Sequence, residues 1–315
     1  MMTTEADEIR ALARSARLTR VGVSRLAADR PGQPIVICIV RNELRRLPYF
    51  LAHYRRLGAA HFLFVDNGST DGSREFLASQ ADVDLFEMLD PFSAKAKHGW
   101  IMRLVEEYGD RWYMLADADE HAVFHGTKNL QSLAAAAERS GLRRVRGFLL
   151  DMYSDKPLAI DHRRSDQSFL QAYPFFDPEG YRDNRLELLT SRMGGPRQRT
   201  LSRIKPDFMP EMTKYPLFRL TADETLVSPH YVDPPLLGDD PCWIALLHFK
   251  FDGDALAHIS DAIARGQYWQ GSYEYRVYDE AIRRFSGFSF MYPDSRRYRG
   301  TADLVDLGLI EAVPV

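Results

Sequence analysis

Residues 112–126, WYMLADADEHAVFHG, decide the fold and point to one end of it. The segment opens with an apolar run typical of a strand, and Asp117, Asp119 and Glu120 follow directly. Because an isolated buried carboxylate carries a large desolvation cost, these acids belong at the rim of a sheet. There they could share a hard divalent cation such as Mg²⁺ or Mn²⁺. The alternative is a solvated acidic turn after an edge strand, so the neighbouring sequence has to decide.

The segments upstream repeat one pattern, in which an apolar run ends in polar residues and a helical pattern follows. The apolar runs are 35–40 (IVICIV) and 61–65 (HFLFV), and the polar runs are 41–43 and 66–71. Strands that alternate with helices predict a mostly parallel, Rossmann-type α/β sheet with helices on both faces. Ligands bind such sheets beyond the carboxyl ends of the strands, where the acidic cluster also lies. This convergence favours a ligand site over an acidic turn.

Composition excludes several classes of protein. With 315 residues, 45% of them hydrophobic, the chain can bury a large core, and a formal charge of -3 argues against a nucleic-acid surface. The two cysteines predict neither a disulfide framework nor a cysteine metal cluster. Neither a signal-peptide pattern nor an uninterrupted apolar run of membrane-spanning length is evident. We therefore expect a soluble, cytoplasmic protein, with peripheral membrane contact left open.

Three motifs taken together resemble a known family. VRNE at 40–43, FVDNGSTDG at 64–72 and LADADE at 115–120 look like the successive signatures of family 2-type glycosyltransferases with a GT-A fold. The nearest branch has an R-N-E start and a D-A-D-E metal motif and is related to family 92. The resemblance is strong over residues 34–126 and looser through KYPLFR at 214–219, HY at 230–231 and LHFK at 247–250. It implies a GT-A-like fold that binds a nucleotide sugar, commonly a UDP-sugar, and a carbohydrate or glycoconjugate acceptor.

The resemblance also implies an organisation of the chain. Residues 1–33 would be an N-terminal helical extension, and 34–160 the α/β half that binds the nucleotide sugar. Residues 161–253 would form acceptor-side loops and closing strands of the same domain, and 254–315 a C-terminal helical segment. Within this scheme, residues 160–210 are rich in Arg and show little periodicity. They predict an irregular excursion over one end of the sheet, of the kind that often serves as a lid or binding element.

The family places the donor against the ends of the strands. By resemblance, Asn42 and Glu43 would lie near the nucleoside, and Asp66 would accept hydrogen bonds from the base or ribose. Many members have a second Asp where this chain has Asn67, a departure that affects base specificity. The alternative for residues 66–71 is a helix-capping turn. The residues expected at the donor are Arg41, Asn42, Glu43, Asp66, Asn67, Lys97, Ala118 and Lys250.

Asp117 and Asp119 match the D-x-D motif that binds Mn²⁺ or Mg²⁺ on the diphosphate in the family. A cation there stabilises the negative charge that develops on the leaving diphosphate. His248 is the candidate third ligand. Lys250, which shares a strand face with it, and His230 are candidate phosphate partners. The alternative for His248 is a core histidine with its hydrogen bonds satisfied.

An inverting enzyme needs a general base to deprotonate the acceptor hydroxyl. Asp151 and Asp155 follow the next predicted strand and are our candidates, with Glu120 as a competitor. The alternative is that both aspartates are turn residues. The Arg-rich segment 182–203 could hold a diphosphate or a charged acceptor by forked hydrogen bonds, or be a solvated loop.

Two other functions share parts of this pattern. A nucleotidyltransferase should show a glycine-rich basic loop near the first strand, where this chain has RNELRR. A non-catalytic nucleotide- or sugar-binding protein of the same fold would not need the acidic motif and the later histidines together. The sequence therefore favours a metal-dependent glycosyltransferase.

Overall fold

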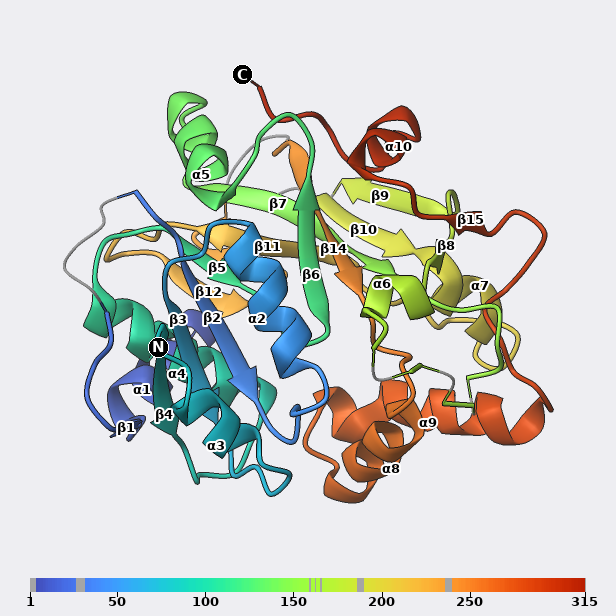
Figure 1. Ribbon diagram of the computed structural model, residues 1–315, viewed down its shortest axis with the longest axis horizontal. Helices are drawn as coiled ribbons and strands as arrows, with labels where there is room; N and C mark the ends of the chain where they lie inside the picture. The colour runs from blue at the N-terminus through green and yellow to red at the C-terminus, as the bar shows by residue number, and fades with distance from the viewer. Residues whose placement is uncertain are drawn as a thin grey trace.

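The computed structural model describes residues 4–26, 32–158, 160–161, 163–164, 166–185, 190–235 and 240–314. A nine-stranded sheet forms the centre of the molecule (Figure 1). Its strands, in spatial order, are β1 (Thr19–Val21), β4 (Val83–Glu87), β3 (Phe62–Asp66), β2 (Ile35–Val40), β5 (Tyr113–Leu115), β11 (Thr213–Phe218), β7 (Arg144–Asp151), β14 (Cys242–His248) and β6 (Glu120–Phe124).

Most strands of this sheet run in one direction. β2 pairs in parallel with β3 and β5, β3 with β4, and β7 with β14. β1, β11 and β6 run the other way and pair antiparallel with their neighbours. The predicted α/β class with a mostly parallel sheet is therefore confirmed. The antiparallel strand β11 was not predicted, although it joins β5 to β7 in the middle of the sheet.

Helices cover both faces, because alternate residues of the central strands point to opposite sides. In β2, Val36 and Cys38 belong to a core with α2 (Leu47–Arg56) and α5 (Leu130–Arg139). Ile35 and Ile37 belong to the core on the other face, with α1 (Glu5–Ser15) and α4 (Ala94–Tyr108). Two short helices, α3 (Ser73–Ala78) and α10 (Thr301–Asp306), also contribute to the first core.

The N-terminal residues do more than form a helical extension. α1 is capped by Thr4, and the chain then adds β1 to the edge of the sheet by pairing with β4. Arg20 of β1 fixes this edge by donating to Asp84 at 2.6 Å. Residues 27–31 of the predicted extension lie outside the described residues.

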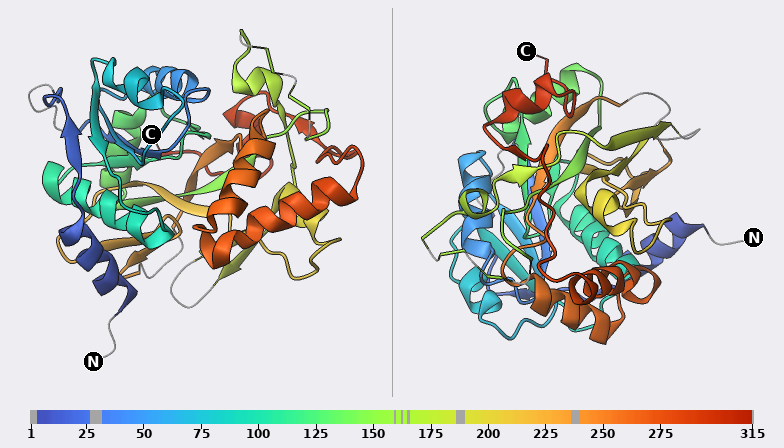
Figure 2. Two further views of the ribbon diagram at one scale, coloured as in Figure 1. Left: turned by 90° about the horizontal axis from the view of Figure 1, so that it is seen from below. Right: turned by 90° about the vertical axis from the view of Figure 1, so that its right-hand side faces the viewer.

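A third apolar cluster lies beyond the carboxyl ends of the strands and is built by the C-terminal part of the chain. It contains α8 (Ala255–Arg265) and α9 (Trp269–Arg284), which Figures 1 and 2 show in orange at that end. α8 ends at Gly266, which has a φ of 59° and is therefore suited to a helix C-cap. The two helices thus complete a core beyond the ends of the strands.

The region 160–210 is more ordered than the sequence indicated. It contains the hairpin of β9 (Tyr181–Arg185) and β10 (Thr190–Gly194), followed by α7 (Gly195–Leu201). The remaining short elements are α6 (Phe169–Ala172), β8 (Phe175–Phe176), β12 (Thr225–Ser228), β13 (Tyr231–Asp233) and β15 (Arg296–Arg297). Across the described ranges, no helix combines the length and apolar character needed to cross a membrane.

Candidate functional site

A pocket lies where the carboxyl ends of β2, β5 and β14 face α8 and α9. Among its lining residues are eight of the predicted ones: Arg41, Glu43, Lys97, Asp117, Ala118, Asp119, His248 and Lys250. The other predicted residues, which do not line it, are Asn42, Asp66, Asn67, Glu120, Asp151 and Asp155. The strand ends thus bring together side chains more than 200 positions apart in the sequence. The α/β pattern predicted this meeting for Arg41, Glu43 and the acidic turn, and the family resemblance added His248 and Lys250.

The turn between β5 and β6 presents the acidic motif to this pocket. β5 ends at Leu115 and β6 begins at Glu120, so Asp117 and Asp119 lie in the turn. The backbone N–H of Glu120 closes the turn by donating to the carbonyl of Asp117 at 2.9 Å. β6 then pairs antiparallel with β14, in a register that sets Glu120 opposite His248. A strand directly after the motif therefore brings the histidine to it.

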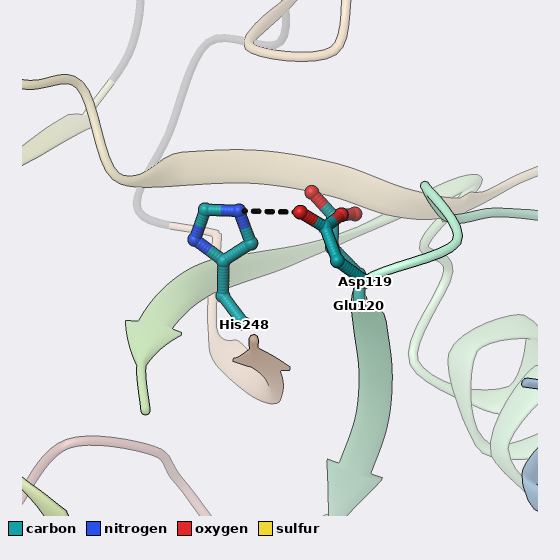
Figure 3. A group of neighbouring side chains, drawn as sticks. All are labelled: Asp119, Glu120 and His248. Atoms are coloured by element: carbon teal, nitrogen blue, oxygen red, sulfur yellow. Dashed lines mark ion pairs between the residues drawn. The ribbon is translucent and has the colours of Figure 1, made fainter. Parts of the chain in front are cut away.

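Asp119, Glu120 and His248 form a group whose potential ligand atoms all lie within 4.8 Å of one another (Figure 3). The Nε2 of His248 faces Oδ2 of Asp119 at 3.5 Å. Two carboxylates and an imidazole suit Mn²⁺ or Mg²⁺, the former accepting nitrogen more readily. The donor set therefore fits the predicted cation, and it includes Asp119 and His248 of the predicted ligands.

Asp117 differs from the prediction, because it lies outside that group. Its Oδ1 accepts from Lys97 at 2.5 Å, and its Oδ2 lies 3.4 Å from the Nζ of Lys214. Lys214 also donates to Glu120, whose other oxygen accepts the backbone N–H of Asp117 at 3.2 Å. Two ammonium groups thus neutralise Asp117, and Glu120 takes its place in the group of potential ligands.

Charges in this cluster shift the protonation of its members. Burial opposes ionisation of Asp117, but Lys97 and Lys214 outweigh burial and hold its pKa below the usual value. Burial dominates at Glu120 and raises its pKa. Burial also opposes the charge on His248, yet Asp119 and Asp151 raise its pKa above the usual value. Each charged group of the cluster is therefore held by a neighbour of opposite charge.

Asp151 is placed behind the site. The side chain is fully buried, its Oδ1 faces Nδ1 of His248 at 2.7 Å, and its Oδ2 accepts from Nε of Arg197 at 2.8 Å. A carboxylate engaged in this way cannot reach an acceptor hydroxyl in the pocket. The prediction of Asp151 as general base is therefore corrected, since the last residue of β7 turns toward β14.

Asp155, the other candidate base, is exposed on the surface. Its carboxylate lies 3.5 Å from Lys156 and away from the pocket lining. The chain turns away from the site after β7, since Tyr153 forms a bridge with Phe175. Asp155 is thus a surface turn residue, which was the alternative interpretation.

The first two polar loops are held together by their own side chains. Oδ1 of Asn42 accepts the backbone N–H of Thr70 at 2.7 Å, and Nδ2 of Asn67 donates to the carbonyl of Met88 at 2.8 Å. Oδ2 of Asp66 accepts the backbone N–H of Ser69 at 3.1 Å. Its Oδ1 is buried and has no hydrogen-bond partner within the described part of the chain. Asn42 and Asn67 therefore shape the loops, whereas Asp66 keeps one oxygen unsatisfied.

Three arginines of segment 182–203 pair with carboxylates of the protein. Arg192 is held by Asp183 at 2.6 Å, and Arg199 by Asp177 at 2.7 Å. Arg197 binds Asp151, as described above, and Glu274 of α9. These pairs occupy the guanidinium groups of the three arginines, so they are not free to bind a diphosphate. His230, a candidate phosphate partner, instead contacts the carbonyl of Thr213 through Nδ1 and does not line the pocket.

One wall of the pocket was not predicted. α8 and α9 contribute His258, Asp261, Arg265, Tyr275 and Tyr278, and Tyr268 lies between them. The Nζ of Lys250 lies 4.8 Å from the ring centroid of Tyr275 and 3.8 Å from Oε2 of Glu274. The spacing of Tyr275 and Tyr278 puts both on one helical face. The sequence spacing could have shown that the two tyrosines share a helical face, but not that this face lines the pocket.

Arg46 was also missed. It lies in the RNELRR segment, where it makes a two-pronged ion pair with Asp252, both bonds being 2.9 Å. It also reaches Glu43 at 3.0 Å. This buried pair joins the start of α2 to the segment before α8, and so fixes opposite walls of the pocket.

Comparisons with known proteins add little to this description. No family model matches the chain, and no curated protein matches it. Among solved structures, apo UDP-glucose pyrophosphorylase is similar at 7% identity and a TM-score of 0.25, covering 51% of this chain and 67% of that one. UDP-glucose pyrophosphorylase complexed with UDP-glucose is similar at 8% identity and a TM-score of 0.27, covering 88% and 97%. At such low TM-scores, function has to be argued from the residues of the pocket.

Proposed function

We propose that this protein is a metal-dependent glycosyltransferase with a GT-A-like fold. It moves a sugar from a nucleotide sugar, most simply a UDP-sugar, to a hydroxyl of a carbohydrate or glycoconjugate. One observation carries the proposal: the turn after a central parallel strand presents Asp119 to His248 in a pocket that Lys97 and Lys250 also line. Carboxylates for a cation and ammonium groups for phosphate at the same strand ends suit a nucleoside diphosphate.

The cation would be held by Asp119, Glu120 and His248, whose ligand atoms are already grouped. When bound, Mn²⁺ or Mg²⁺ would act as a Lewis acid toward the diphosphate. Lys250 would donate to phosphate oxygens, since its ammonium is held at the pocket wall by the Tyr275 ring and Glu274. Lys97 and Lys214 keep Asp117 ionised and fixed, so that the turn carrying Asp119 keeps its shape.

The nucleoside would lie over the loops after β2 and β3. Support comes from Asp66, whose buried Oδ1 has no partner in the described chain and suits a donor from a base or ribose. Arg41 joins the two loops, because its Nη1 donates to the carbonyl of Asn67 at 2.9 Å. A small shift of these loops on binding would bring Asp66 to the ligand.

A nucleotidyltransferase remains the second candidate. It would also bind a nucleotide sugar, but as the product formed when the nucleotidyl group of a nucleoside triphosphate is transferred to a sugar phosphate. The loop after β2 argues against it, because Arg46 is tied to Asp252 and is not free for a triphosphate. The two reactions differ in their products, since glycosyl transfer releases a nucleoside diphosphate and nucleotidyl transfer releases pyrophosphate.

Calorimetry with UDP, with and without Mn²⁺, tests the proposal directly. We expect affinity for UDP to rise when Mn²⁺ is present, and the Asp155→Asn protein to behave as the wild type because Asp155 lies on the surface. Incubation with a panel of nucleotide sugars and acceptors should then release the nucleoside diphosphate, whereas incubation with UTP and sugar 1-phosphates should release no pyrophosphate. Absence of metal-dependent affinity for any common nucleoside diphosphate would refute the metal site. Pyrophosphate formation would instead establish the second candidate.

A further inference from the structure

Arg197 of α7 lies behind the pocket and connects two elements of the fold. It is buried, and its guanidinium contacts two carboxylates that come from different elements. Nε donates to Asp151 at the end of β7 at 2.8 Å, and Nη1 donates to Glu274 of α9 at 2.5 Å. Neither Arg197 nor the two carboxylates line the pocket. Any effect of Arg197 on ligands must therefore pass through other side chains.

Each carboxylate in turn contacts a side chain that does line the pocket. The second oxygen of Asp151 faces Nδ1 of His248 at 2.7 Å, and the second oxygen of Glu274 lies 3.8 Å from the Nζ of Lys250. His248 and Lys250 are two residues apart at the end of β14. A single guanidinium thus holds the partners of both the imidazole and the ammonium group that face the ligand.

This arrangement fixes the side of the imidazole that faces the cation. An Nδ1–H that donates to Asp151 leaves the Nε2 lone pair directed toward Asp119, at 3.5 Å from its Oδ2. An outer carboxylate partner of this kind orients a metal-binding histidine and increases its basicity. Asp151 can do this only while its own second oxygen is engaged, because an uncompensated buried carboxylate would rotate or become protonated.

We propose that Arg197 is a positioning residue for cation binding, acting through Asp151 on His248 and steadied by Glu274 of α9. This inference rests on the metal site of the proposed function. It adds that the affinity of the site for its cation depends on a residue of α7 that touches neither cation nor donor. α9, which lines the pocket with Tyr275 and Tyr278, is tied to the same guanidinium.

The test is titration with Mn²⁺ alone, in which electron paramagnetic resonance measures the free ion. Arg197→Lys should weaken Mn²⁺ affinity by about 10-fold, the lower end for loss of an outer-shell partner. Arg199→Lys is the matched control, because Arg199 lies two residues further along the chain and binds buried Asp177 through two nitrogens, at 2.7 and 3.0 Å. The Mn²⁺ affinity of Arg199→Lys should stay within about twofold of the wild-type value, even if the two substitutions lower the melting temperature by similar amounts.

A double-mutant cycle separates positioning from a general loss of structure. If Arg197 acts through Asp151, then Arg197→Lys combined with Asp151→Asn should lose no more Mn²⁺ affinity than Asp151→Asn alone. If the fold losses of Mn²⁺ affinity in the two single variants instead multiply in the double variant, the proposal is overturned. If Arg197→Lys does not fold, Glu274→Gln, which releases the guanidinium from the other side, should weaken Mn²⁺ by a smaller factor. Unchanged affinity in Glu274→Gln would then overturn it.

The wild-type titration distinguishes this inference from the function on which it rests. Wild-type protein that binds no Mn²⁺ would overturn the metal site and, with it, the role of Arg197. Wild-type binding together with unchanged affinity in Arg197→Lys would overturn the role of Arg197 and leave the metal site intact.

Discussion

Lys214, on the antiparallel strand β11, donates a hydrogen bond to Glu120 and lies 3.4 Å from Oδ2 of Asp117. One ammonium group therefore bridges two acids of the motif that the sequence singled out. It comes from a strand that joins the sheet some hundred positions later in the chain. The acidic turn is thus completed by tertiary structure, which has consequences for both stability and ligand binding.

Replacing Lys214 by Met should destabilise the fold, because it leaves the buried carboxylate of Glu120 without its ammonium partner. Breaking a buried ion pair from one side typically costs about 3–5 kcal/mol in the free energy of unfolding. Urea denaturation measures this cost. Lys156→Met is the control, since Lys156 is half exposed and pairs only weakly with Asp155. Added Mn²⁺ should recover more stability in Lys214→Met than in the wild type. Equal stability of the two variants would contradict this account of the cluster.

Asp119→Asn should remove Mn²⁺-dependent binding of UDP while the protein stays folded. The substitution takes away a charged ligand that faces His248 in the pocket. The loss of Mn²⁺ affinity should exceed the roughly 10-fold typical of an outer-shell change. Calorimetry provides the measurement, and circular dichroism verifies the fold. Wild-type Mn²⁺ affinity in Asp119→Asn would show that the cation binds elsewhere.

Lys250→Met should weaken binding of UDP more than binding of UMP. We place Lys250 against the second phosphate, and a hydrogen bond to a charged group contributes about 1.5–3 kcal/mol, or roughly 10-fold or more in affinity. Kd values for UDP and UMP, each measured with Mn²⁺, test this difference. Lys156→Met again serves as the surface control. An equal loss for both nucleotides would indicate that Lys250 acts on the pocket as a whole.

Glu43 should make stability depend on pH. Burial raises the pKa of its carboxyl from 4.5 to about 8, against the opposing effect of Arg46. A carboxyl whose folded pKa exceeds its unfolded pKa favours the folded state below the unfolded value, and this contribution is lost as the pH rises through 8. Glu43→Gln should therefore be more stable than the wild type at pH 9, by about 1–3 kcal/mol, and close to it at pH 4.5.

Denaturation curves at the two pH values test the prediction for Glu43. The pair of Arg46 with Asp252 remains in the variant, so the fold around Glu43 should be retained. A difference in stability that does not change between pH 4.5 and pH 9 would show that Glu43 titrates normally in the folded protein.

The sequence alone determined the architecture and the edge of the sheet at which a ligand should bind. Apolar runs such as IVICIV specify buried strands locally, and the carboxyl ends of parallel strands meet at one edge whatever the details. The acidic turn could therefore be placed beside the ends of the first strands in advance, and the family resemblance added His248 and Lys250. Their convergence follows from topology.

Only the tertiary structure decided which partner each charged group has. Asp151 looked like an available base because it follows a strand, but the register between β7 and β14 turns it to His248. Arg197 looked like part of a solvated or ligand-binding loop, yet it is buried between two carboxylates. Pairing between charges depends on which faces meet after folding. A buried charge is tolerated only with a partner, and its partner here lies far away in sequence.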